Sequence, residues 1–310
     1  MCYSAQIWAD YKKYVRTFGA DISVRRYVEL FWEKKKSGDW QKIPKAMKAA
    51  FAVPRTEEER EVHALIAETD EEQALAFESV LFQQKTRLTG AERVMASGKP
   101  TKKAESDVRV AGNKIEQAQR KLSDLRRTEL LDRDSRIYPG QYAPVMIRKD
   151  GKRLVVPMRY QCRMPGWTEA VERKYPGTYN ARRDNLEKAW GQLFGYHHGI
   201  MVVTKFYENV ERDGKNVVLE FDPQPPREML VACLWSFSKG GEGEADLFSF
   251  AAITDEPPPE VLAAGQDRCI VPIKPENIDA WLTPDPTNLA AQYAILDDRA
   301  RPYYEHQMAA

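Results

Sequence analysis

The first residues of the chain carry its most distinctive chemistry, because a cysteine follows the initial methionine. Removal of Met1 would leave Cys2 with a free α-amine and a thiol on adjacent carbons. In reference peptides these groups ionise at about 7.7–8.0 and about 8.5, so both are available as nucleophiles near neutral pH. Such an aminothiol forms a Schiff base with an aldehyde, and its thiolate then closes a thiazolidine ring. The alternative is that Cys2 has no function at a frayed terminus.

Three segments in the second half of the chain carry groups suited to binding or proton transfer. Asn180 and Arg182 place an amide and a guanidinium two residues apart, and Trp167 ends a turn sequence. Glu208 alternates with Phe206 in a predicted strand, so both side chains face the same side. Burial there would raise the pKa of Glu208, which suits a general acid–base. Each residue also has an ordinary structural explanation: Asn180 as a cap, Arg182 in a surface ion pair, and Glu208 as an edge-strand carboxylate.

The histidine and cysteine pattern argues against a metal site or a disulfide framework. His197 and His198 are adjacent, so their side chains point in different directions, and no further ligand follows at metal spacing. We therefore expect a loop or the start of a strand there. The four cysteines are widely spaced and form no CxxC pair. This pattern predicts reduced thiols in the cytoplasm, with no metal and no cofactor.

Composition is that of a globular protein with a core: 43% of the 310 residues are hydrophobic and 30% are charged. No apolar run approaches the roughly 20 residues needed to span a bilayer, so we expect no membrane association. Trp8, Asp10, Lys12 and Lys13 interrupt any signal-peptide core. The net charge of +1 means that any nucleic-acid surface must be a local patch.

Residues 22–135 have a helical pattern. Apolar spacing predicts helices over about 21–36 and 43–51. Thr56 and Glu59 then form a capping box that opens a long helix to about Leu88, and Gly90, followed by Ser97-Gly98-Lys99-Pro100, is expected to break it. A second long helix carries a heptad seam: Val108, Ala111, Ile115, Ala118, Leu122 and Leu125. We predict an antiparallel helical hairpin over 56–135, serving either as an inserted structural arm or, through its basic side chains, as a DNA or partner clamp.

From residue 137 onward the pattern changes to strands. Runs at 154–158, 200–207, 217–221, 229–237, 247–254 and 268–273 predict a largely antiparallel sheet. Asp213-Gly214 predicts a hairpin turn, and 276–282 a short helix. The predicted fold class is therefore α+β. The expected domains are 1–21 with 136–300 as the β domain, 22–135 as the helical insertion, and 301–310 as a tail.

Six short segments occur in the order seen in one protein family: Met1-Cys2, Tyr142-Ala143-Pro144, Pro165-Gly166-Trp167, Asn180-Ala181-Arg182, Phe206-Tyr207-Glu208 and Asp267-Arg268. On these residues the chain resembles the SRAP (SOS response-associated peptidase) family. The resemblance covers about the first dozen residues and 137–283, and leaves the hairpin outside. It implies a barrel-like β domain that captures abasic sites in single-stranded DNA.

The resemblance also implies a role for each matched residue. Cys2 would form the crosslink, and Asn180 would position the N-terminus and the sugar. Arg182 would hold a phosphate bidentately. Glu208 would move protons during sugar-ring opening and thiazolidine closure. Trp167 would stack on a base beside the lesion.

Two further matched residues are implied DNA contacts, and three positions depart from the family pattern. Arg268 would be a second phosphate contact, and Pro144 belongs to the same implied DNA-binding set. The family usually has Gly-Arg after the cysteine, where this chain has Tyr3-Ser4, and a Trp after Phe-Tyr-Glu, where this chain has Asn209. Gln266 stands where the family has an active-site His. A glutamine side chain hydrogen-bonds but exchanges no proton near neutral pH.

The sequence thus predicts an enzyme that crosslinks to abasic single-stranded DNA, with a possible autoproteolytic loss of Met1. One alternative is an N-terminal-nucleophile cysteine peptidase that trims only its own Met or a propeptide. The other is a non-catalytic single-stranded DNA-binding module that uses the aromatic and arginine side chains without covalent capture. The sequence identifies no partner for the helical arm.

Overall fold

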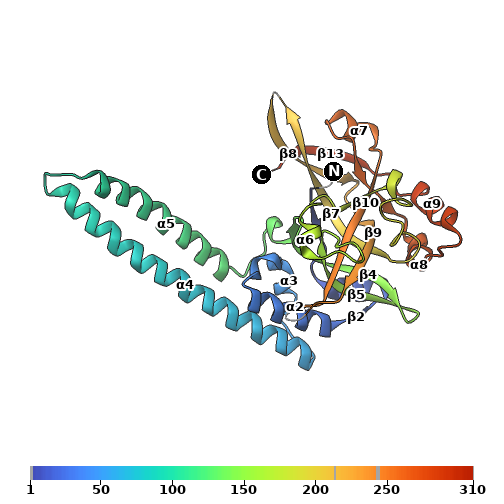
Figure 1. The fold of residues 1–310 in the computed structure, drawn as a ribbon, viewed down its shortest axis with the longest axis horizontal. Coiled ribbons are helices and arrows are strands. Elements are labelled where there is room, and N and C mark those ends of the chain that lie inside the picture. The colour runs from blue at the N-terminus through green and yellow to red at the C-terminus, as the bar shows by residue number, and fades with distance from the viewer. Residues whose placement is uncertain (1–2, 213, 242–244, 310) are drawn as a thin grey trace. The chain divides into compact units, whose positions relative to one another are not determined.

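The computed structural model describes residues 3–212, 214–241 and 245–309 (Figure 1). These residues form two compact units. One is Arg60–Leu130, and the other joins the chain before Arg60 to the chain from Leu131 onward. We call them the helical unit and the β unit. Residues 22–59, which the sequence pattern assigned to the insertion, group with the β unit.

The helical unit is an antiparallel hairpin. It contains most of α4 (Glu57–Ala96) and all of α5 (Lys102–Arg126), which begins where the Thr101 side chain accepts a hydrogen bond from the backbone of Ala104 at 3.1 Å. Within the predicted seam Ala111 and Ala118 are buried, and Val108, Ile115, Leu122 and Leu125 are half-buried. Ala104, seven residues before Ala111, is buried as well. Ion pairs of Arg87 with Asp107 and of Arg126 with Glu78 connect the two helices. The predicted hairpin is therefore present.

The predicted break at Gly90 is wrong, because α4 continues to Ala96. Glycine inside a helix costs only about 1 kcal/mol relative to alanine. Ala91, the next residue, is 6% exposed and continues the buried side of α4. Packing of that side outweighs the propensity of one glycine. At the other end, the predicted cap is present, since the backbone N–H of Glu59 donates to the Thr56 hydroxyl at 3.2 Å.

Five strands of the β unit pair in a ring: β7 (His198–Arg212), β4 (Tyr142–Lys149), β5 (Lys152–Tyr160), β10 (Leu247–Asp255) and β9 (Met229–Ser238). Each pairs with the next, and β9 pairs back to β7. All pairings are antiparallel except β5 with β10. The predicted largely antiparallel α+β fold is confirmed, although the ring is not a regular barrel because β4 meets β7 at a single register pair.

Further strands extend this ring. They are β1 (Ser4–Ile7), β2 (Asp21–Ile22), β3 (Arg136–Ile137), β6 (Asn180–Arg182), β8 (Lys215–Gln224), β11 (Cys269–Ile270), β12 (Pro272–Ile273) and β13 (Tyr303–Met308). β1 lies between β7 and β3, and β6 runs parallel to β10. β13 pairs with β8, so the segment expected as a tail belongs to the sheet. Asp213 of the expected turn lies outside the described residues, while Arg212 pairs with Lys215 around it.

Helices cover the β unit at its periphery. They are α1 (Tyr11–Phe18), α2 (Val24–Ser37), α3 (Lys45–Ala49), α6 (Glu169–Glu172), α7 (Pro259–Ala263), α8 (Ile278–Leu282) and α9 (Leu289–Asp297). Single 3₁₀ turns occupy Trp40–Lys42, Asp132–Ser135, Arg183–Asn185 and Pro275–Asn277. Among the described residues, we find no helix with both the length and the apolar character to cross a membrane. The core is built from inward-facing strand residues and aromatic rings such as Phe206, Phe250 and Trp281, all fully buried.

Candidate active site

The N-terminal strand is held firmly against the long strand β7. Ser4 lies opposite Tyr207 and Ala5 opposite Phe206 in an antiparallel register. The Tyr207 hydroxyl donates to the Gln6 amide oxygen at 2.9 Å, while Arg136 lies 3.6 Å over the Tyr207 ring and donates to the Ser4 hydroxyl at 3.0 Å. The same register carries Tyr3 to the level of Glu208.

Cys2 itself lies outside the described residues, so its side chain has no structural account here. Three other cysteines are described, and all are buried: Cys162, Cys233 and Cys269. Burial raises the pKa of the Cys162 thiol to about 12, and it raises those of Cys233 and Cys269 as well. Buried protonated thiols are poor nucleophiles, which leaves Cys2 as the candidate.

Glu208 is a buried carboxyl group on β7, with 1% of the residue exposed. Burial, and to a smaller extent the negative charge of Asp267, raise its pKa, while a backbone hydrogen bond from Tyr3 lowers it; the resulting pKa is about 8. Phe206 and Tyr207 are buried as well, so β7 is buried on both faces at this point and Glu208 has apolar neighbours on its own strand. Near neutral pH such a group exists in both protonation states, which a proton shuttle requires.

The loop from Gly265 to Arg268 runs beside Glu208. The Gln266 side chain is buried and donates through Nε2 to the backbone carbonyl of Asn209, the residue after Glu208. Gly265 takes a φ of +103°, which a side chain would strain. Gln266 is therefore bonded to the residue that directly follows the buried carboxylate of Glu208.

The same loop connects Glu208 to the Asn180–Arg182 strand. Asp267 acts electrostatically on both Glu208 and Arg182. Arg268 approaches Asp184 at 4.0 Å, and Asp184 in turn binds Arg182 through two contacts of 3.1 and 2.6 Å. Sequence reasoning missed Asp184, and it named Asp267 only as part of a matched segment without giving it a role. Both stand within two residues of a candidate arginine, which was the available signal.

Asn180 is buried on β6, and neither its amide oxygen nor its amide nitrogen has a hydrogen-bond partner among the described residues. The hydroxyl of Thr254, which lies opposite Arg182 on β10, is in the same condition. A buried polar group without a partner costs about 1–3 kcal/mol. Groups held at that cost are candidates to receive a ligand, and Thr254 had no sequence signal of its own.

Arg182 has 45% of its side chain exposed, so its bidentate pair with Asp184 is open to exchange for another anion. Trp167 follows a turn closed by a 3.0 Å backbone bond to Met164, and its ring lies 5.0 Å from that of Tyr175. The two half-exposed rings form an aromatic pair on the surface of the β unit.

The structure does not bring Pro144 to this cluster. Pro144 lies in the buried middle of β4, where the Tyr14 hydroxyl joins its carbonyl to the backbone N–H of Val202. Val202 is six residues along β7 from Glu208, which is about 20 Å of strand. Nothing in this geometry supports Pro144 as a DNA contact.

The histidine pair marks the start of β7, as predicted. Nδ1 of His198 bonds the carbonyl of Trp281 at 3.1 Å, and Nε2 accepts from the backbone of Gly195 at 2.9 Å. Burial lowers the pKa of His198 to about 3 and also lowers that of His197. His198 is therefore a neutral structural residue.

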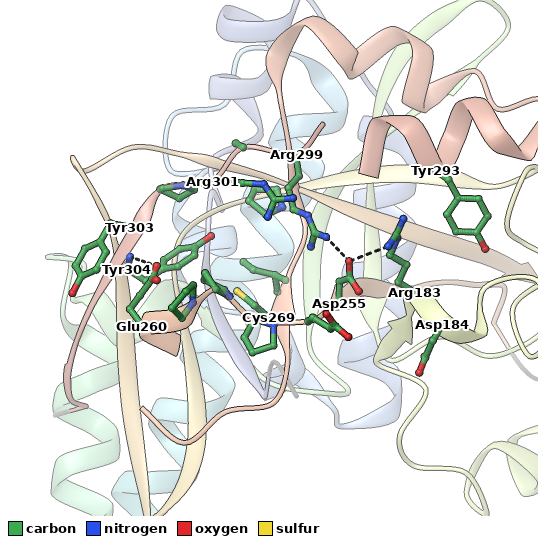
Figure 2. A pocket seen from close by; sticks show the side chains of 18 residues that line it. Arg183, Asp184, Asp255, Glu260, Cys269, Tyr293, Arg299, Arg301, Tyr303 and Tyr304 are labelled. Atoms are coloured by element: carbon green, nitrogen blue, oxygen red, sulfur yellow. Dashed lines mark hydrogen bonds and ion pairs between the residues drawn. The ribbon is translucent and has the colours of Figure 1, made fainter. Parts of the chain in front are cut away.

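A cavity of about 920 Å³ borders the cluster and is shown in Figure 2. Asp184 and Cys269 belong both to its lining and to the surroundings of Arg182 and Glu208. Inside it Asp255 pairs with Arg299 and, at 3.7 Å, with Arg183 (Figure 2). The cavity therefore leaves open space next to the cluster around Arg182 and Glu208.

Comparison with known proteins places the chain in a family. Residues 106–309, more than half of the chain, match the family described as SOS response associated peptidase (SRAP). No curated protein matches. A solved structure from Bordetella bronchiseptica is similar at 18% identity, over 57% of this chain and 87% of that one, with a TM-score of 0.46. A Bacteroides thetaiotaomicron protein (12% identity, 57% and 78%, TM-score 0.48) and a phage-related protein from Bordetella bronchiseptica (18%, 60% and 85%, 0.44) are also similar. On the extent of its sequence match, the chain belongs to the SRAP family.

Proposed function

We propose that this protein captures abasic sites in single-stranded DNA by covalent attachment to Cys2. The observation that carries the proposal is the position of Glu208. Its buried carboxyl group, with a pKa raised to about 8, lies against the backbone of Tyr3, the residue that directly follows Cys2. Membership of a family named for the SOS response to DNA damage supports a role in DNA binding.

The first step frees the nucleophile. Hydrolysis of the peptide bond between Met1 and Cys2 gives the α-amine at residue 2. The amine adds to the aldehyde carbon of the opened abasic sugar, and loss of water from the carbinolamine leaves an imine. Glu208 in its protonated form donates the proton that lets hydroxide leave as water.

The second step closes the ring. The thiolate of Cys2 adds to the imine carbon, and the imine nitrogen takes up a proton to give the thiazolidine. Carboxylate Glu208 accepts the thiol proton in this step, so one residue acts as acid and then as base. Overall, the aldehyde and the aminothiol combine with loss of one water, and no oxidant or reductant is needed.

The residues around Glu208 supply binding. Arg182 exchanges Asp184 for a DNA phosphate, and Arg268 contacts a second phosphate. The unpartnered amide of Asn180 hydrogen-bonds the sugar or the N-terminus, which satisfies a buried group that is otherwise left without a partner. The Trp167–Tyr175 pair offers an aromatic face to a neighbouring base.

Intact mass spectrometry after incubation with an abasic oligonucleotide tests the proposal. A mass lacking Met1, increased by the oligonucleotide minus one water and stable to heat and detergent, supports it. A shift from Met removal alone would indicate a self-trimming peptidase. Salt-sensitive retention of the oligonucleotide without any covalent species would indicate a non-catalytic DNA-binding module.

A further inference from the structure

A second concave feature lies at the other end of the strand ring. Its volume is about 410 Å³. β5 pairs with β10 only at Ser249–Arg159 and Phe250–Tyr160. The cleft lies before these pairs on both strands, since its lining contains Leu154 and Val156 of β5 and Phe248 of β10. Phe248 of the cleft and Thr254 of the candidate active site are six residues apart on β10, or about 20 Å. The cleft is therefore separate from the candidate active site.

Aromatic rings form one wall of this cleft. Trp235 and Phe237 come from β9 and Phe248 from β10, with His197 beside them. The Phe237 and Phe248 ring centroids are 4.8 Å apart, and those of His197 and Trp235 are 4.6 Å apart. Phe237 is 42% exposed, whereas Phe250 on the neighbouring strand is fully buried. An accessible cluster of rings on a sheet is a surface on which flat groups stack.

Three cationic side chains also line the cleft, Arg26, Arg148 and Lys149, and none of the described residues of its lining is a carboxylate. Asp279 lies near Arg148 at 3.3 Å, but it is also bound by Arg153 at 2.8 Å. One carboxylate therefore offsets two arginines.

Arg26 is in the same situation. Its partner Glu29, at 2.7 Å, also contacts Arg25 at 3.6 Å, and Asp246, which interacts electrostatically with Arg26, is paired with Lys239 at 3.0 Å. Each of these carboxylates is shared between two cations, so with Lys149 added the described residues of the cleft carry an excess of positive charge. The guanidinium of Arg26 lies 5.0 Å from the centre of the Phe248 ring, so charge and aromatic surface meet within the cleft.

We propose that this aromatic cleft is a second binding site for single-stranded nucleic acid. Bases stack on Phe237 and Trp235 while the backbone phosphates contact Lys149 and Arg148. Stacking on aromatic side chains combined with a cationic groove is the general way in which proteins hold single strands without reading sequence. The inference deepens the proposed function, because the strand captured at Cys2 would be held at a distant second point.

The test uses an undamaged thymidine oligonucleotide of about 25 nucleotides, so that no covalent chemistry takes part. Affinity is measured by fluorescence anisotropy for the full chain and for Phe237→Ala. Loss of one stacked base is expected to weaken binding by between about fivefold and a hundredfold. Tyr196→Ala is the matched control, since Tyr196 is 57% exposed and lies outside the cleft, and its affinity should equal that of the wild type.

Charge is tested separately. Lys149→Ala is expected to reduce the slope of log affinity against log salt by about 0.7, the value for one phosphate contact on a single strand. Lys188→Ala, an exposed lysine outside the cleft, should leave the slope unchanged. Photocrosslinking from 5-iodouracil followed by peptide mapping should identify Trp235 or Phe237.

Three results would overturn the inference: equal affinity of Phe237→Ala and wild type, crosslinks that map only outside the cleft, or Phe237-dependent binding of an acidic aromatic peptide in place of the oligonucleotide. Adduct formation is followed in the same variants with an abasic oligonucleotide too short to reach about 20 Å. If no variant, including the wild type, forms an adduct while Phe237→Ala still weakens strand binding, the proposed function fails and the second site stands.

Discussion

Ser4 of β1 lies directly opposite Tyr207 of β7 in the sheet. This one register pair sets Tyr3, the residue that follows Cys2 in the sequence, beside Glu208. The register is fixed by side chains on both strands, with Arg136 bonded to Ser4 and packed on the Tyr207 ring.

Replacing Cys2 separates covalent capture from binding. Cys2→Ala should abolish the stable adduct with abasic DNA while affinity for the strand is retained, because the arginines and Trp167 are untouched. Cys2→Ser keeps the amine and should give at most an imine that borohydride traps. Both are read on denaturing gels with and without borohydride. A borohydride-independent adduct in Cys2→Ala would show that another residue is the nucleophile.

Glu208→Gln should slow adduct formation by about 10²- to 10⁴-fold, the usual contribution of a general acid–base. Glutamine keeps the shape and the neutral form of the side chain but cannot exchange the proton. Single-turnover rates with an abasic oligonucleotide measure the change, and Glu211→Gln on the exposed end of β7 is the matched control. Equal rates for Glu208→Gln and wild type at every pH would remove Glu208 from the mechanism.

The same substitution should stabilise the protein at alkaline pH. The pKa of Glu208 is raised to about 8 in the fold, against an ordinary value of about 4.3. Between those values the folded state holds a proton that the unfolded state has released, so stability falls as pH rises from about 4.5 to 8. Glu208→Gln removes this loss of folding free energy. The loss is of order 1.4 kcal/mol for each pH unit between the two pKa values, and a few kcal/mol in total at most.

Thermal unfolding at pH 4.5 and pH 8.5 checks this. The melting temperatures of wild type and Glu208→Gln should be similar at the lower pH and should separate at the higher pH, with the variant above. The opposite sign would mean that burial does not dominate the environment of this carboxyl group.

The sequence revealed local patterns much better than long-range pairing. The seam through Ala111 and Ala118 was visible because a helix repeats its buried face every seven residues. The burial of Glu208 was visible because strands alternate. The pairing of Ala5 with Phe206, and with Ile137 on the other side, joins segments far apart in the chain and leaves no local signature.

The candidate site shows the same division. Asn180, Arg182 and Glu208 were identified through the order of the motifs. Their arrangement in space depends on the loop around Gln266, and the sequence did not predict the contacts of that loop. Thr254 was missed because an isolated threonine in a strand is ordinary until its hydroxyl is found without a partner. The assignment of residues 22–59 to the insertion ignored Tyr11, whose hydroxyl donates to Glu59 at 2.8 Å within the β unit.

The seam of the helical unit can be broken selectively. Ala111 is fully buried, so Ala111→Asp places an unpaired carboxylate among apolar side chains at a cost of about 1–3 kcal/mol or more. Loss of part of the helical circular dichroism is expected. Lys114→Asp, on the exposed side of α5, should leave the signal nearly unchanged. The β unit is a separate compact unit, so adduct formation should persist in both variants; its loss in Ala111→Asp would show that the arm is required for capture.

Gln266 should make the crosslink slow to reverse. Its side chain lies beside Glu208 and donates to the carbonyl of Asn209. The resemblance described for the sequence implies a histidine at this position. Ring opening of a thiazolidine needs a proton on nitrogen or sulfur, and a glutamine supplies none in the physiological range. His198 cannot substitute, because it is buried and bonded to Trp281 and Gly195 with a pKa lowered to about 3. We expect adduct formation to proceed through Glu208, with release that varies little between about pH 5 and 8, where a histidine would titrate.

The measurement is exchange of a preformed adduct against excess competitor abasic DNA in wild type, Gln266→His and His198→Ala. Faster exchange in Gln266→His, with a pH profile centred near 6.5, supports the assignment. Rapid exchange in wild type that collapses in His198→Ala would overturn it and place the acid on the start of β7.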